Sequence, residues 1–322
     1  MTLFSYKKIF ILLSLLVFNL HSFADNSPTQ QFTSFINANI DAPVLSELEQ
    51  KNSQKYSYVF IAGFLNEGLL SYFKDNIDVL EEMGISKSDI HVIRPSSSQS
   101  IEENIPYFKK KLEEVLSQSK KPLILFAHSK GGAEALALAL REQDFTLKNI
   151  EKMFLIQAAI GGSAVADFIH HEGHKIDNKL PLKDRIFFNT SAITGQLLDP
   201  IINKGMGSLT HKKASALWKK LQSENPPLPK AISDKIFYIN SKQDVSKMAE
   251  AVDCTGAYIQ TYYSDNDGLV EVKDQYLKGV GTRLTVIDAD HADLMTPFPI
   301  SNDPKKIRIS LMYSLIQFLA LP

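Results

Sequence analysis

The sequence predicts an α/β fold, with a mostly parallel central sheet and helices on both faces. Short β-branched and aromatic runs, which are typical of buried strands, recur along the chain. Segments of helical composition separate these runs, so strands and helices alternate. The chain has 322 residues, of which 44% are hydrophobic, and this suits one large globular domain with a substantial core.

The elements follow in chain order. Strands are expected over residues 58–62, 91–94, 123–126, 152–157, 235–240 and 283–288. Helices are expected near 44–51, over 102–118, directly after the third strand, over 212–221, near 272–277 and, as an amphipathic helix, over 304–319. The strand rhythm is lost over about 161–230, which we interpret as a cap inserted over the end of the sheet. A single domain would then span residues 25–322.

Residues 1–24 have the pattern of a secretory signal peptide. Lys7 and Lys8 precede the apolar block IFILLSLLVF, and Ser22 and Ala24 are the small residues that a signal peptidase requires. We therefore expect cleavage after Ala24 and a periplasmic or secreted protein. A retained membrane anchor is the alternative, although the apolar block is shorter than the roughly 20 residues of a membrane span.

Charge and cysteine content narrow the classes of partner. Without residues 1–24 the chain has 33 basic and 36 acidic residues, a net charge of −3. Proteins that bind nucleic acid concentrate basic residues on one face, so no nucleic-acid partner is expected. The single cysteine, Cys254, cannot form an internal disulfide, and it is either a buried small side chain or a reactive thiol.

The segment PLILFAHSKGGAEALALAL carries the strongest chemical signal. An apolar strand stops at His128, and an alanine-rich helical run starts at once. This is the strand, sharp turn and helix of a nucleophile elbow, in which Ala127 replaces the first glycine and Ser129 occupies the tip. A serine that simply caps a helix in an ordinary loop is the alternative.

The end of the chain offers partners for this serine. Asp265 and Asp267 lie in a turn within YYSDNDGLVEV, and His291 follows the last strand. A serine hydroxyl needs an imidazole to accept its proton and a carboxylate to orient that imidazole. The order Ser, Asp, His on loops after strands is that of the α/β-hydrolase fold, and Ser129, Asp267 and His291 satisfy it. Asp265 is the alternative acid, and Asp267 in an Asn-Asp-Gly turn is also explained by turn formation alone.

An oxyanion hole in this fold is made by two backbone N–H groups. One belongs to the residue after the nucleophile and the other to the loop after an earlier strand. Here these residues are Lys130 and Phe64. Removing one such donor costs roughly 2.7–4 kcal/mol of transition-state stabilisation.

Several blocks resemble those of secreted bacterial triacylglycerol lipases, a branch of the α/β-hydrolases. In chain order they are VFIAGFLNEG, LILFAHSKGG, IGGSAVADFI, SDNDGLV and DHADLM. The resemblance runs from about residue 58 to the C-terminus and is poor in the cap. It implies that Asp267 is the acid and that the base, His291, stands two residues before Asp293 and 24 residues after Asp267.

The chain departs from this family in three places. Ala62 replaces the histidine before Gly63, which removes a hydrogen bond that steadies the oxyanion loop. Lys130 follows the nucleophile, where we expect it to put a cation at the mouth of the pocket. The block after the strand at 152–157 reads Ala159-Ile160-Gly161 in place of a Pro-His pair. These departures bear on substrate class more than on mechanism.

Metal ligands are not clearly indicated. The resemblance implies that Asp293 helps to hold a structural calcium ion, but calcium takes six to eight oxygen ligands, and Asp244 is the one other candidate. The site is therefore left unassigned, and no cofactor is expected to be required. The segment HHEGH, from His170 to His174, lacks the spacing of a zinc motif and is interpreted as a solvated polar patch.

Taken with the resemblance, these residues predict an exported serine ester hydrolase, a lipase or esterase that cleaves carboxylic esters of lipid or acylglycerol type. A phospholipase or acyltransferase with the same triad is one alternative, and a non-catalytic, hydrolase-like binding protein is another. The apolar patches of the cap are either ordinary core or a lid that touches a lipid interface. Neither this choice nor the oligomeric state follows from the sequence.

Overall fold

The computed structural model describes residues 27–68, 71–170, 204–243, 265–296 and 304–321. These residues form a six-stranded sheet in the order β2-β1-β3-β4-β5-β6, and every neighbouring pair is parallel. The strands are β1 (Ser57–Ile61), β2 (Ile90–Ile93), β3 (Leu123–His128), β4 (Ile150–Ile156), β5 (Ile236–Lys242) and β6 (Thr282–Asp288). The predicted strands and the predicted parallel α/β class are confirmed.

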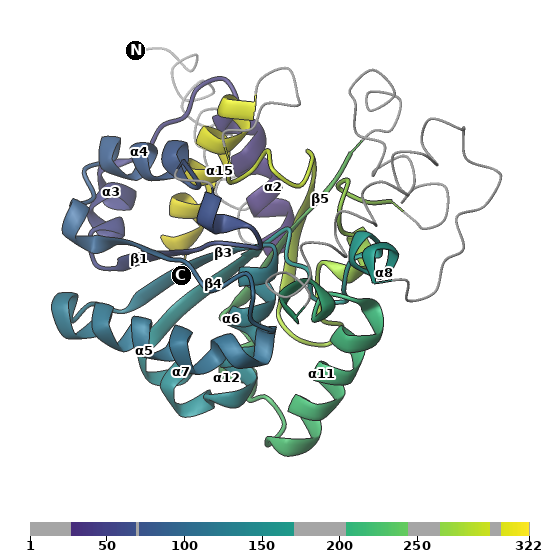
Figure 1. Ribbon diagram of the computed structural model, residues 1–322. Coiled ribbons are helices and arrows are strands. Elements are labelled where there is room, and N and C mark those ends of the chain that lie inside the picture. Colours follow the sequence, from purple (N-terminus) through teal and green to yellow (C-terminus); the bar gives the residue numbers. More distant parts are fainter. Residues whose placement is uncertain (1–26, 69–70, 171–203, 244–264, 297–303, 322) are drawn as a thin grey trace, which may run out of the picture.

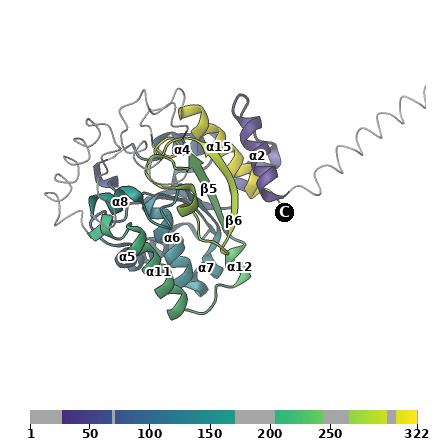
Figure 2. The ribbon, with the colours of Figure 1, turned by 90° about the vertical axis from the view of Figure 1, so that its right-hand side faces the viewer.

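Helices cover both faces of the sheet (Figures 1 and 2). One face carries α2 (Pro28–Asn39), α3 (Glu47–Ser53), α4 (Lys74–Glu82) and α15 (Pro304–Leu319), of which α15 contacts the other three. The opposite face carries α5 (Ile101–Ser119), α6 (Lys130–Arg141), α7 (Gln143–Asn149), α11 (His211–Glu224) and α12 (Lys230–Ser233). The sheet is thus enclosed, as parallel sheets require.

Two apolar cores form because successive side chains of a strand point to opposite faces. In β1, Val59 and Ile61 pack under α5 and α6, while Tyr58 and Phe60 pack in the core with α15. On the second face four aromatic rings form a row across neighbouring strands, with centroids 5.6–5.9 Å apart: Tyr58, Phe126, Phe154 and Phe237. All six residues of β3 are buried, which gives the residue that follows it a rigid support.

Several helices differ from the expectations. No expected helix corresponds to α2 or α7, both of which are rich in polar residues. The helix expected near 272–277 is only a short 3₁₀ turn, η3 (Val272–Asp274). Helix α15 is buried on most of its surface, since it is enclosed by α2, α3, α4 and the sheet, so it has no broad polar face.

Part of the expected cap is described. It includes α8 (Ala164–Ile169), a helical turn at 204–207 and α11, which packs on α6. The rest of the cap at 171–203 and the expected signal peptide at 1–24 lie outside the described residues, as do Cys254, Asp244, His171 and His174. Within the described segments no helix is long and apolar enough to cross a bilayer.

Candidate active site

Ser129 lies at a strained turn between β3 and α6. Its backbone has φ 56° and ψ −126°, a combination that costs a non-glycine residue on the order of 1–3 kcal/mol. The surrounding structure holds this turn in place: the Ser129 N–H donates to Ile156 O over 3.1 Å, and Ser129 O accepts from the Ala159 N–H over 3.2 Å. Ser129 is therefore fixed to the end of the neighbouring strand β4.

The turn has no room for larger residues. A Cβ atom on Gly131 would lie 2.6 Å from the carbonyl oxygen of Ala62, and one on Gly63 would lie 2.7 Å from the Cβ of Ser129. Real Cβ atoms do not approach so closely. These two glycines let the loop after β1 lie directly against Ser129.

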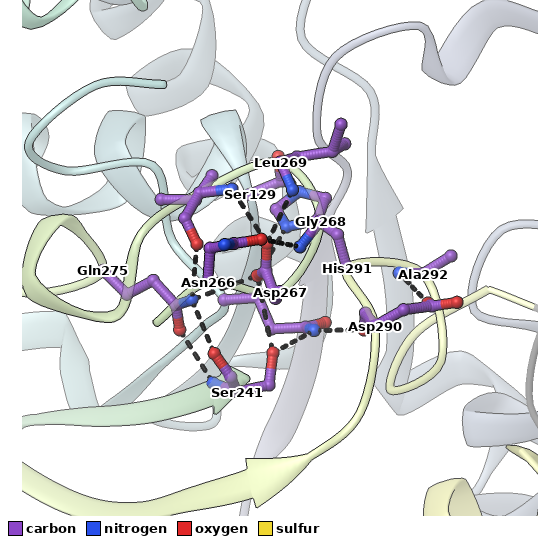
Figure 3. Close-up of polar contacts among 12 residues, drawn as sticks. Ser129, Ser241, Asn266, Asp267, Gly268, Leu269, Gln275, Asp290, His291 and Ala292 are labelled. Atoms are coloured by element: carbon purple, nitrogen blue, oxygen red, sulfur yellow. Dashed lines mark hydrogen bonds and ion pairs between the residues drawn. The ribbon is translucent and has the colours of Figure 1, made fainter. Parts of the chain in front are cut away.

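His291 bridges Ser129 and Asp267 (Figure 3). Its Nε2 lies 2.8 Å from Ser129 Oγ, and its Nδ1 lies 2.8 Å from Asp267 Oδ2. Because the carboxylate can only accept, Nδ1 carries the proton, and the unprotonated Nε2 accepts from the serine hydroxyl. Ser129 and His291 are each 8% exposed and Asp267 is fully buried. The structure thus brings together three side chains that the chain separates by up to 162 residues.

Asp267 has a structural role as well as its contact with His291. Its Oδ1 accepts from the N–H groups of Leu269 and Val270 over 3.1 and 2.8 Å, which closes the turn. Its Oδ2 accepts from Gln275 Nε2 over 3.1 Å as well as from His291. One carboxylate oxygen of Asp267 therefore stabilises the turn, and the other contacts the imidazole of His291.

The alternative acid, Asp265, lies at the surface. Its carboxylate is 3.1 Å from Lys242 Nζ, and its side chain is 67% exposed. The hydrogen bond to His291 is made by Asp267.

The two residues expected to form the oxyanion hole lie close to Ser129. Lys130 directly follows Ser129 at the start of α6, and Phe64 follows Gly63, which touches Ser129. Within the described residues, neither the backbone N–H of Phe64 nor that of Lys130 donates a hydrogen bond. In the described part of the chain, neither N–H group is therefore committed to another acceptor.

The side chain of Lys130 corrects one expectation. It does not place a cation at the pocket mouth, because it is only 2% exposed. Its ammonium group donates to the carbonyl oxygens of Ser96 and Gln99 over 3.0 and 2.6 Å and lies 3.2 Å from Glu134 Oε1. The reason is that the turn of α6 directs this side chain under the loop after β2, where two carbonyl groups need donors.

That loop in turn holds the oxyanion loop. Ser97 Oγ accepts from the Leu65 N–H over 2.8 Å, and the carboxylate of Glu67 accepts from the Ser97 N–H over 2.7 Å. Asn66 Nδ2 donates to Gly63 O over 2.9 Å and to Pro95 O over 2.8 Å. The residue after the nucleophile is therefore connected through the β2 loop to the backbone around Phe64.

Tyr72 provides a support that no sequence pattern predicted. Its hydroxyl oxygen accepts from the Gly63 N–H over 3.1 Å, and its O–H donates to His128 Nδ1 over 2.5 Å. The hydrogen bond expected to be missing because of Ala62 is replaced by one to the backbone of Gly63. No local motif marks Tyr72, because it contacts this loop only through the fold.

His128 connects the nucleophile strand to the histidine loop. Its Nε2 donates to the carbonyl oxygen of His291 over 2.9 Å and lies 3.1 Å from Gln157 Oε1. Burial lowers the pKa of His128 to about 3, so the ring is neutral at physiological pH. Gln157 Nε2 donates to Ser241 Oγ and to Asp290 O, each over 2.5 Å. This network supports both loops that carry the site.

Of the two residues considered for a calcium ion, the structure describes Asp293, whereas Asp244 lies outside the described residues. Asp293 is fully buried, its Oδ2 accepts from the Asp290 N–H over 3.2 Å, and its carbonyl oxygen accepts from Arg308 Nη1 over 2.9 Å. Burial, together with the charge of Asp293, raises the pKa of Asp290 to about 6.

The chain is similar to known proteins in fold but not in sequence. No family model matches the chain, and no curated protein is similar to it in sequence. Among solved structures it is similar to the metagenomic carboxyl esterase MGS0156, with a TM-score of 0.59 and 17% identity over 83% of this chain and 76% of that one. It is also similar to the mature form of the Bacillus licheniformis lipase BlEst2, with a TM-score of 0.53 and 18% identity over 74% of this chain and 85% of that one.

At such low identity these likenesses bear on architecture alone. They agree with the parallel sheet enclosed by helices that the structure shows. The chain has the α/β-hydrolase fold.

Proposed function

We propose that this protein is a serine hydrolase of carboxylic esters that works through an acyl-enzyme. The observation that carries the proposal is the position of the His291 imidazole, 2.8 Å from Ser129 Oγ on one side and 2.8 Å from Asp267 Oδ2 on the other. A general base must lie within hydrogen-bond reach of the proton it removes, and an orienting carboxylate must hold the correct tautomer. Both conditions are met.

In the proposed first step, Ser129 Oγ attacks the ester carbonyl carbon while its proton moves to His291 Nε2. Asp267 stabilises the imidazolium ion that forms, and the N–H groups of Phe64 and Lys130 donate to the oxyanion. The alcohol leaves with the proton from His291. A water molecule then attacks the acyl-enzyme, again with His291 as base, which releases the acid and restores the serine.

The proposed substrate class is a lipid ester such as an acylglycerol. This rests on the resemblance of the sequence blocks to bacterial lipases and on the names of the similar structures, a lipase and a carboxyl esterase. We further propose export, on the pattern of residues 1–24. The mass of the mature protein tests export: a chain that begins at Asp25 supports it, and a chain that retains its first residues contradicts it.

The activity is tested with a fluorophosphonate probe and with p-nitrophenyl esters of graded acyl length. We expect the probe to label Ser129, and we expect Ser129→Ala to lose the label and at least about 1,000-fold in kcat/KM while it keeps its fold. Absence of both labelling and hydrolysis in the wild type would favour a binding protein. If an added alcohol receives the acyl group faster than water does, the protein is an acyltransferase with the same triad.

A further inference from the structure

A cluster of side chains that could hold a metal ion lies near the proposed active site. His211 at the start of α11 faces Glu271 and Asp274, which lie just before and within η3. The ligand atoms of these three residues all lie within 4.8 Å of one another. Glu271 is 1% exposed, and Asp274 and His211 are partly buried, so this is not an array of surface acids.

The distances match those between ligands of one metal ion. His211 Nε2 lies 3.1 Å from Asp274 Oδ2 and 3.4 Å from Glu271 Oε2. Zinc bonds to nitrogen and oxygen of about 2.0–2.2 Å at tetrahedral angles place two ligand atoms roughly 3.3–3.6 Å apart. An ion could therefore enter among these atoms with small side-chain movements.

Asp167 fixes the histidine ring in the orientation that a metal ligand needs. Its Oδ2 lies 2.6 Å from His211 Nδ1, and its Oδ1 accepts from the His211 N–H over 2.9 Å. A carboxylate on one ring nitrogen of a metal-bound histidine sets the tautomer and aims the other nitrogen at the ion. Here the nitrogen that is left to aim is Nε2, and it points at the two carboxylates.

Charge also favours a cation. Asp167, Glu271 and Asp274 bring three carboxylates to one imidazole, and Lys273 Nζ lies 3.1 Å from Glu271 Oε1. If the imidazole is neutral, the three carboxylates and the Lys273 ammonium group leave a net charge of −2, which a divalent ion would offset. The donor set of one imidazole nitrogen and two carboxylates suits zinc better than calcium, which takes oxygen ligands.

We propose that His211, Glu271 and Asp274 bind a divalent transition-metal ion of the zinc type, with Asp167 orienting His211 from outside. The ion would join α11, and α8 through Asp167, to the segment after the acid turn. That segment also carries Gln275, whose amide donates to Asp267 Oδ2 over 3.1 Å. The metal would thus fasten the base of the cap to the support of Asp267. This inference does not depend on the proposed ester hydrolysis.

The test is metal binding by the full chain after treatment with a chelator. We expect one equivalent of Zn²⁺ to bind and to raise the midpoint of thermal unfolding, whereas Ca²⁺ at the same concentration does not. His211→Gln and Asp274→Asn should weaken Zn²⁺ binding more than 100-fold. Asp167→Asn should weaken it about 10- to 100-fold, the usual effect of losing an orienting carboxylate.

Two matched controls keep the result specific. Asp234→Asn removes an exposed acid that pairs with Lys230 on α12, and it should leave Zn²⁺ binding unchanged. His171→Ala with His174→Ala removes the other histidine-rich segment and should also bind normally. The proposal is overturned if the folded wild type binds no Zn²⁺. It is also overturned if the folded His211→Gln and Asp274→Asn variants both bind Zn²⁺ normally while the double variant at His171 and His174 does not. The first outcome would leave the cluster as a salt-bridge network around a protonated His211.

Discussion

His128 Nε2 donates a hydrogen bond of 2.9 Å to the backbone carbonyl of His291. The residue before Ser129, the proposed nucleophile, therefore supports the loop that carries the proposed base. The other ring nitrogen of His128 accepts from Tyr72, whose oxygen accepts from the Gly63 N–H. One chain of hydrogen bonds thus connects the oxyanion loop to the histidine loop beneath Ser129.

Replacing Tyr72 with phenylalanine breaks this connection. We expect Tyr72→Phe to lower kcat about tenfold with little change in KM, because the variant loses the alignment of the oxyanion loop, which matters in the transition state. Steady-state kinetics with a soluble p-nitrophenyl ester measure both constants.

Tyr58→Phe is a matched control, since it removes a buried phenol that donates to Ser53 O over 2.6 Å, far from the site along its strand. Each variant should lose about 1 kcal/mol of stability. An equal loss of kcat in the two variants would contradict a positioning role for Tyr72.

Asp267→Asn should lower kcat by about 10³–10⁴ while the turn persists, because an amide at this position favours the wrong tautomer of His291. Asp265→Asn should leave kcat within about twofold, since Asp265 pairs with Lys242 at the surface. Kinetics of the two purified variants distinguish the acids. A large loss in Asp265→Asn together with an active Asp267→Asn would reverse the assignment.

Lys130→Met removes the ammonium group that holds the loop after β2. At pH 8, where Glu134 is ionised, breaking a buried ion pair costs roughly 3–5 kcal/mol, so we expect strong destabilisation as well as lower activity. The double variant Lys130→Met with Glu134→Met should recover most of the stability, because an apolar pair replaces the ion pair. Its kcat should stay at least about tenfold below that of the wild type. Full recovery of kcat in the double variant would show that Lys130 acts on stability alone.

Glu134 should make stability depend on pH. Burial raises the pKa of Glu134 from 4.5 to about 7, against the opposing charge of Lys130. Between these two pH values the folded protein holds a proton that the unfolded chain has released. The free energy of unfolding therefore falls as pH rises through this window, by on the order of 2–3 kcal/mol.

Glu134→Gln keeps the acceptor for Asn104 and cannot titrate. Relative to the wild type, this variant should become more stable as pH rises from 5 to 8. Denaturant unfolding of both proteins at the two pH values measures the difference. A difference in stability that is constant with pH, or one that moves in the opposite direction, would contradict the shifted pKa.

The strands, their order along the chain and the strained serine turn were predictable from the sequence. They depend on local patterns: apolar runs of strand length, and small residues around Ser129, where a side chain would clash. The polar helices α2 and α7 were not predicted, because they gain their stability from packing against distant elements such as α15 and β4. The 3₁₀ turn at 272–274 replaced a longer helix because Gln275 bonds to the backbone of Ser241 and to Asp267.

The sequence alone determined which side chains could form the site, since Ser129, Asp267 and His291 stand in local motifs with recognisable turn chemistry. Only the tertiary structure decided which acid contacts His291, where the Lys130 ammonium lies, and that Tyr72, His128 and Gln275 support the loops. The physical reason is the separation along the chain of the groups that interact. Turns and strand ends depend on neighbouring residues, whereas these hydrogen bonds join groups that only the assembled sheet and its two helical layers bring within 3.1 Å.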